Sequence, residues 1–175
     1  MWFSLPEGVP ADFRARLSTA VTVPEAGDYD LSLASAGLSR LSLNDQELIE
    51  NWENFELGDT YLGFGSREVR ASVFLQAGTH EVVIEFAPQK IDNGIATISA
   101  LRFGFRRPLP ESSVAEAARV AAQADCAVVC IGTNGDWETE GVDRSGLDLP
   151  GRQNELVRAV VQANPHTVVL LQTGG

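Results

Sequence analysis

The sequence predicts an α+β protein, in which an all-β sandwich domain is followed by a partial α/β domain. Residues 1–107 alternate apolar and polar side chains in short runs separated by turn residues, the period of half-buried strands. Residues 116–175 instead combine amphipathic helical segments with strands that are apolar throughout, which is typical of a parallel sheet with crossover helices. A short proline-containing linker, 108–115, separates the two domains.

The alternating runs of the first domain are its candidate strands. They are 13–23, 29–36, 39–45, 46–51, 67–75, 80–87 and 95–105. Asn44-Asp45 predicts a hairpin between the third and fourth runs, and 24–28 and 76–78 read as turns. Because several short strands follow one another with regular turns and no helix of useful length, we expect a sandwich or barrel.

The second domain is expected to run helix, strand, loop, helix, strand. Ser112 or Ser113 can cap the first helix, and Pro150 is suited to the start of the second. The predicted elements are a helix over 114–125, a strand over 126–132, a helix over 150–165 and a strand over 166–175. Two parallel strands are too few to bury their own faces, so we expect this domain to be incomplete in the chain.

Composition excludes several classes of partner. The 175 residues carry 13 basic and 24 acidic side chains, a net charge of −11, which argues against nucleic acid. No apolar run is long enough for a transmembrane helix, so no membrane partner is expected. Cys126 and Cys130 lie too far apart along a predicted strand for a disulfide, and we expect both to be small core residues. The lack of a signal peptide and of a disulfide favours a cytoplasmic location.

The segment GDWETEGVDR, 135–144, places four acidic residues, a tryptophan and an arginine in one short loop. The loop follows the carboxyl end of a predicted parallel strand, where ligands bind in open α/β sheets. A carboxyl group beside Trp137 and other acids would have a raised pKa and could act as a general acid towards a sugar. The alternative is a solvated acidic loop in which Arg144 pairs with Asp143 or Asp148.

A second candidate surface is the long connection 51–68 in the first domain. It carries four aromatic residues: Trp52, Phe55, Tyr61 and Phe64. Exposed aromatic rings on a sandwich loop suggest a surface that faces sugar. The structural alternative is that the rings fill the end of the sandwich as core, since large aromatic side chains are usually mostly buried.

Other chemistries find no support in the residues. The acidic loop does not follow the calcium-binding EF-hand pattern, and His80 and His166 have no Cys or Glu at ligand spacing, so no metal is expected. The glycines of 63–66 lack the Lys-Ser/Thr pair of a phosphate loop, and no G-x-S-x-G sequence supports a serine hydrolase. We therefore expect no cofactor.

The second domain closely resembles the C-terminal sandwich domain of family 3 glycoside hydrolases, the β-glucosidase group. The likeness rests on IGTN, WETEGVDR, LDLPGRQNELV and ANPHTVVLLQTGG, all within 124–175. The first domain resembles the protective-antigen-type β-sandwich that is inserted in a subset of that family, over 27–55 and 63–86. The resemblance covers nearly the whole chain and implies a fragment of such an enzyme.

The resemblance implies hydrolysis of terminal β-linked sugars with retention, by an Asp nucleophile and a Glu acid/base. The nucleophile would lie on a (β/α)₈ barrel that is absent from this sequence. Glu140 matches the acid/base position, with Glu138 as the runner-up. The residues expected to bind substrate are Asp136, Trp137 and Arg144 in the loop and Trp52 and Phe64 in the first domain.

The implied partners are an oligosaccharide or β-glucoside substrate and the missing barrel domain of the same polypeptide. Because it carries no nucleophile, this chain alone is expected to be inactive. Two alternatives stay open at this point. One is a stand-alone carbohydrate-binding module without catalysis, and the other is an inert product of a broken reading frame.

Overall fold

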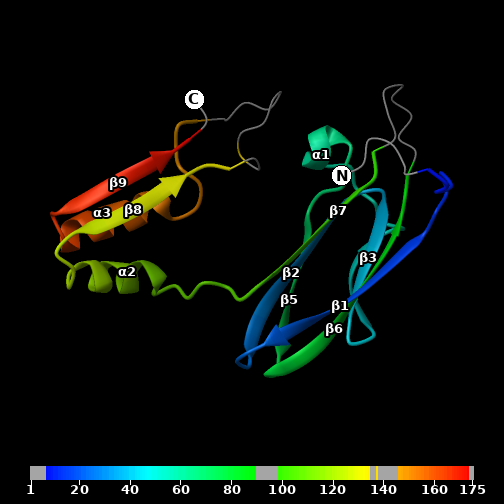
Figure 1. Cartoon of the computed structure of the whole chain (residues 1–175), viewed down its shortest axis with the longest axis horizontal. Helices are drawn as coiled ribbons and strands as arrows, with labels where there is room; N and C mark the ends of the chain where they lie inside the picture. Colours follow the sequence, from blue (N-terminus) through cyan, green and yellow to red (C-terminus); the bar gives the residue numbers. More distant parts are fainter. Residues whose placement is uncertain (1–6, 90–97, 135–136, 138–145, 174–175) are drawn as a thin grey trace. The chain divides into compact units, whose positions relative to one another are not determined.

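A computed structural model describes residues 7–89, 98–134, 137 and 146–173. The chain divides into two compact units, Met1–Pro108 and Leu109–Gly175 (Figure 1). The first unit contains antiparallel sheets, and the second contains a parallel pair of strands with helices. The predicted α+β class is therefore confirmed.

The first unit is a sandwich of two antiparallel sheets. Its elements are β1 Ala15–Val23, β2 Gly27–Ala36, β3 Leu38–Leu43, β4 Gln46–Asn51, α1 Thr60–Gly63, β5 Val69–Leu75, β6 Gly78–Ala87 and β7 Ala100–Arg106. One sheet has the strand order β1-β6-β3-β4 and the other has the order β5-β2-β7. Buried residues of both sheets, such as Leu31 and Leu33 on β2 and Leu41 on β3, join in one hydrophobic cluster.

The connections show why neighbours in sequence are not always neighbours in a sheet. Asn44 and Asp45 both have left-handed backbones, with φ of 48° and 64°, and form the predicted hairpin between β3 and β4. The predicted turn at 76–78 instead carries the chain from one sheet to the other, because β5 pairs with β2 whereas β6 pairs with β1 and β3. The turn at 24–28 does the same between β1 and β2.

The middle strand β2 separates the core from an outer face. Tyr29, Leu31 and Leu33 are buried in the cluster between the sheets. The ring of Tyr29 stacks on Phe105 of β7 with centroids 5.3 Å apart, and its hydroxyl donates to the carbonyl oxygen of Glu25 at 3.0 Å. Residues of even number on β2 therefore point to the opposite, outer face of the β5-β2-β7 sheet.

The second unit is a two-stranded parallel sheet with two helices. Its elements are α2 Ser113–Ala121, β8 Ala127–Gly132, α3 Gln153–Ala163 and β9 Thr167–Gln172. The strands pair in register from Ala127 opposite Thr167 to Gly132 opposite Gln172. A small core of Ala121, Val129 and Val160 joins β8 to the two helices. Among the described residues, no helix is long and apolar enough to span a membrane.

The prediction that both cysteines are core residues is wrong for this chain, since Cys126 and Cys130 are exposed. Val129 faces the helices, so Cys130 lies on the opposite face of β8, as Val128 does. That face is apolar and uncovered within the described part of the chain. Its exposed fractions are 63% at Val128, 55% at Val168 and 51% at Leu170.

Candidate active site

The carboxyl end of β8 is the framework of the candidate site. Gly132 ends the strand, and a Cβ atom there would overlap the carbonyl oxygen of Gln172 on β9. Glycine is the residue that allows this close approach of two backbones. One residue further on, the Thr133 amide donates to the same Gln172 oxygen at 3.0 Å and so continues the parallel ladder. The two backbones therefore stay together up to the start of the acidic loop.

The first residue of α3, Gln153, binds the edge of β8 that faces away from β9. The Gln153 side chain donates from Nε2 to the Gly132 carbonyl at 2.9 Å and accepts the Gly132 amide at 2.7 Å through Oε1. Gln153 thereby satisfies both polar groups of a residue on the open edge of β8. The sequence analysis assigned no role to Gln153. The available signal was a glutamine at the start of the predicted helix, at the far end of the acidic loop.

Arg152, just before α3, anchors the same helix end. Its guanidinium donates to both carboxylate oxygens of Glu155 at 2.7 Å and to the Glu111 carbonyl at 2.9 Å. The hydrogen bond with Glu155 raises the pKa of Arg152, and the same bond lowers the pKa of Glu155. The ion pair is exposed, so it orients the helix start more than it stabilises the fold.

Trp137 is the predicted loop residue that the structure describes. Its amide donates to the carbonyl oxygen of Asn134 at 2.9 Å, and the residue is 51% exposed. The other loop residues predicted to act, Asp136, Glu138, Glu140 and Arg144, lie outside the described residues. The structure therefore shows a turn with an accessible indole directly after the end of β8.

An open hollow of about 390 Å³ lies at this end of the sheet. Its lining includes Gly132, Thr133, Gln153 and Gln172. These groups are amides, hydroxyls and backbone polar atoms, which suit hydrogen bonding to a polar, uncharged ligand. No group of His, Cys, Asp or Glu within the described ranges is arranged to hold a metal ion.

Trp52 of the first unit lines a separate cleft of about 300 Å³. The guanidinium carbons of Arg14 and Arg40 lie 5.7 and 5.6 Å from the Trp52 ring centroid, within the range of cation–π attraction. The Glu50 carboxylate fixes the backbone at this position, since it accepts the Trp52 amide at 2.6 Å and the Glu53 amide at 2.5 Å. Trp52 thus has a fixed place beside charged side chains.

Phe64 has different surroundings. Together with Tyr61 it packs on a small buried cluster of Ala36, Ile98 and Ala100. Tyr61 and Leu62 in α1 have left-handed backbones, which turn the chain tightly enough to return it to the sandwich. Phe64 therefore belongs to a small cluster apart from the main core between the sheets, and its surroundings differ from those of Trp52.

A parallel strand whose carboxyl end leads into a polar loop is the arrangement of a ligand-binding α/β domain. Comparison with known proteins then gives the family. The model of the glycosyl hydrolase family 3 C-terminal domain matches residues 15–175. The chain belongs to glycosyl hydrolase family 3, as the sequence analysis predicted.

Several proteins similar to this chain are β-glucosidases. The chain is similar to a β-glucosidase of Rhizobium radiobacter, with 39% identity over 178 residues, covering 99% of this chain and 22% of the relative. The crystal structure of a β-glucosidase from Kluyveromyces marxianus in complex with glucose matches with a TM-score of 0.84 and 36% identity. It covers 91% of this chain and 19% of that protein. The chain therefore spans about a fifth of the length of the proteins it matches.

Proposed function

We propose that this chain is part of a retaining β-glycosidase that hydrolyses terminal β-linked sugars and to which it supplies the acid/base loop. The observation that carries the proposal is the position of the acidic segment 135–144 in the chain. It begins just after the end of β8, which Gln153 and Gln172 hold, in a chain of glycosyl hydrolase family 3. The substrate class is an oligosaccharide or a β-glucoside.

In this proposal Glu140 is the acid/base, with Glu138 as the runner-up. The protonated carboxyl group donates its proton to the leaving glycosidic oxygen and then, as carboxylate, takes a proton from the attacking water. The nucleophilic Asp belongs to a barrel domain of the longer polypeptide. Asp136, Trp137 and Arg144 contact the sugar in the loop. In the first unit Trp52 is the candidate sugar contact, because Phe64 packs on a buried cluster instead.

The assignment is tested with Glu140→Gln and Glu138→Gln in the full-length enzyme. An acid/base variant loses about 10²–10⁴-fold in kcat/KM on a substrate with a poor leaving group, because proton donation to the leaving oxygen is lost. It retains far more activity on an aryl glucoside whose leaving group needs no proton, and added azide restores turnover of that substrate. If Glu138→Gln alone behaves in this way, Glu138 is the acid/base. If neither variant does, the proposal is overturned.

The isolated chain is proposed to be inactive. Double displacement needs a nucleophile as well as an acid/base, and this chain is proposed to supply only the acid/base. Purified chain with an aryl β-glucoside should give no turnover above buffer, and measurable hydrolysis would contradict the proposal. A carbohydrate-binding module without catalysis is the second candidate. It is favoured by the Trp52 cleft, which the first unit builds from its own residues.

A further inference from the structure

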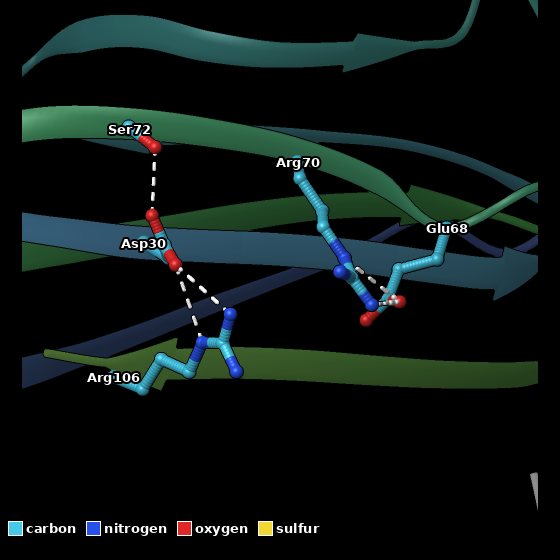
Figure 2. A network of polar contacts seen from close by, with 5 residues as sticks. All are labelled: Asp30, Glu68, Arg70, Ser72 and Arg106. Atoms are coloured by element: carbon cyan, nitrogen blue, oxygen red, sulfur yellow. Dashed lines mark hydrogen bonds and ion pairs between the residues drawn. The ribbon is translucent and has the colours of Figure 1, made fainter. Parts of the chain in front are cut away.

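The outer face of the β5-β2-β7 sheet carries a network of polar side chains from all three strands (Figure 2). Asp30 on β2 lies at its centre. The Ser72 hydroxyl of β5 donates to Asp30 Oδ1 at 2.7 Å, and Nε and Nη2 of Arg106 on β7 each donate to Oδ2 at 3.2 Å. The hydrogen bond from Ser72, with a further contribution from Arg106, lowers the pKa of Asp30, so this carboxylate is ionised and accepts hydrogen bonds only.

A second ion pair lies beside the first on the same face. Arg70 donates to Glu68 Oε2 from Nε at 3.1 Å and from Nη2 at 2.6 Å. The two carboxylates are recessed, with side chains 23% exposed at Asp30 and 25% at Glu68, whereas each arginine side chain is 67% exposed. Nη1 of Arg70 and of Arg106 makes no hydrogen bond among the described residues. Each pair therefore presents acceptor oxygens low in the surface and donor groups at its rim.

Gly104 of β7 and Ser32 of β2 form the floor between the two ion pairs. Gly104 lies opposite Ser32 in the sheet, and a Cβ atom on Gly104 would overlap the Ser32 hydroxyl. The resulting niche has a volume of about 240 Å³ and is lined by Asp30, Glu68, Arg70 and Arg106 among others. Glycine at 104 therefore leaves room for the Ser32 hydroxyl on the niche floor.

An exposed aromatic ring lies on the same face. Phe74 is opposite Asp28 on β2 and two residues from Ser72 along β5, a separation of about 7 Å. Phe74 is a large apolar side chain on the solvent side of the sandwich, and it is 59% exposed. The niche and the ring together span a stretch of β5 from Arg70 to Phe74.

Ion pairs on an exposed surface add little stability, so stability does not account for this arrangement. A sugar hydroxyl both donates and accepts, and adjacent carboxylate and guanidinium groups satisfy both at once. The C–H face of a pyranose packs on an aromatic ring. The net charge of −11 on the chain disfavours a uronate, so an uncharged sugar is the better ligand for this face.

We propose that the outer face of the β5-β2-β7 sheet is a saccharide-binding groove for neutral pyranose chains. Two neighbouring hydroxyls of one sugar enter the niche beside Asp30 and Arg106, and the sugar chain continues along β5 until a later sugar packs on Phe74. The groove is built from the first unit alone, and it holds polysaccharide without cleaving it. The inference goes beyond the proposed hydrolysis and does not depend on Glu140.

The test is calorimetric titration of the full chain with three neutral trisaccharides, cellotriose, laminaritriose and maltotriose, and with trigalacturonate as the charged comparison. At least one neutral trisaccharide should bind saturably, and trigalacturonate should bind at least about tenfold more weakly. Phe74→Ala should weaken binding about tenfold, the value expected for losing one ring contact.

The double variant Ser32→Ala/Gly104→Ala replaces the Ser32 hydroxyl on the floor of the niche with a methyl group and creates no clash, because the new Cβ would lie 3.6 Å from the Cβ of residue 32. It should weaken binding, because the niche floor loses a hydrogen-bonding hydroxyl, and it should leave the thermal unfolding midpoint near that of the parent. Leu17→Ala removes an apolar side chain that is 47% exposed on β1 and serves as the matched control for Phe74→Ala. Its affinity should equal that of the parent.

Three outcomes would contradict the proposal of a saccharide-binding groove. They are no saturable binding of any neutral trisaccharide, binding that neither Phe74→Ala nor the double variant weakens, and binding that only Trp52→Ala abolishes. Hydrolysis of a β-glucoside is measured in a separate experiment with the full-length enzyme. There, Glu140→Gln should leave trisaccharide binding to the groove unchanged, so failure of one proposal is distinguishable from failure of the other.

Discussion

The side-chain amide of Gln153 forms two hydrogen bonds with the backbone of Gly132, donating to its carbonyl at 2.9 Å and accepting its amide at 2.7 Å. The pair joins the first turn of α3 to the last residue of β8. The acidic segment 135–144 lies between these two positions in the chain. The contact therefore links both ends of the region proposed to carry the acid/base.

Gln153→Ala should leave the Gly132 amide and carbonyl without the hydrogen bonds that the Gln153 side chain makes to them. The expected loss in the free energy of unfolding of the second unit is about 1–2 kcal/mol, because a solvent-accessible strand end partly regains hydrogen bonds to water. Hydrogen exchange of the Gly132 amide should also become faster. Gln123→Ala, at an exposed glutamine, is the control and should change neither quantity. Unchanged exchange at Gly132 in Gln153→Ala would contradict the role of the pair.

Asn164 connects both helices to β9. Its Nδ2 donates to the carbonyls of Ala121 at 2.9 Å and Ala124 at 2.8 Å, and its Oδ1 accepts the His166 amide at 2.9 Å. The residue is buried, so Asn164→Ala leaves several polar groups without partners and should cost about 2–3 kcal/mol. Urea unfolding of the chain measures this loss.

The matched control for that variant is Asn154→Ala, at an exposed position of the same helix α3. Alanine has the higher helix propensity, so this change should be neutral or slightly stabilising. Equal midpoints for Asn164→Ala and Asn154→Ala would show that the network around Asn164 contributes no stability.

Glu50 makes the stability of the first unit depend on pH. The hydrogen bond from the Glu53 amide, followed by bonds from Asn54 and Trp52 and against the opposing effect of burial, lowers the pKa of Glu50 from its ordinary value of 4.5. Because the folded pKa is the lower one, this stabilisation is present above about pH 4.5 and is lost as the pH falls through the folded value.

Thermal unfolding of the parent and of Glu50→Gln between pH 7 and pH 3 measures this effect. The two midpoints should differ at pH 7, and the difference should shrink as the pH falls and Glu50 of the parent becomes protonated. Glu56→Gln, at an exposed glutamate, is the control and should follow the parent throughout. A midpoint difference that stays constant with pH would exclude Glu50 as a source of the pH dependence.

The exposed cysteines give a prediction about thiol reactivity. Cys126 and Cys130 of the folded chain should both react with a water-soluble thiol reagent at the rate of accessible thiols. Cys130 shares its sheet face with exposed apolar residues such as Val168 and Leu170, and no described segment covers that face. Mass spectrometry after timed labelling separates the two sites. A Cys130 that fails to label in the folded chain would contradict its exposure.

Several features were predictable because their causes are local. Alternation of apolar and polar residues predicted β2, and Asn44-Asp45 predicted the β3–β4 hairpin, since both depend on neighbours in the chain. The apolar runs that became β8 and β9 predicted a parallel pair. The motifs around 131–157 led to the family, and the match over 15–175 confirmed it.

Other features depend on partners far away in sequence. The turn at 76–78 has the same local character whether the chain forms a hairpin or passes to the opposite sheet, and only the pairing of β5 with β2 decides between them. The exposure of Cys130 depends on which face of β8 the helices cover. The pairing of Gln153 with Gly132, over 21 residues, leaves no periodic signal in the sequence.

By itself the sequence determined the α+β class, the strand and helix types, the family and the candidate acid/base loop, because period, turn chemistry and motif are properties of neighbouring residues. Only the tertiary structure decided which strands share a sheet, which faces stay open, and that Ser32, Asp30, Arg70, Gly104 and Arg106 meet in one niche. These features depend on which distant segments of the chain pair and which side chains they bury, and neighbouring residues in the sequence do not specify that.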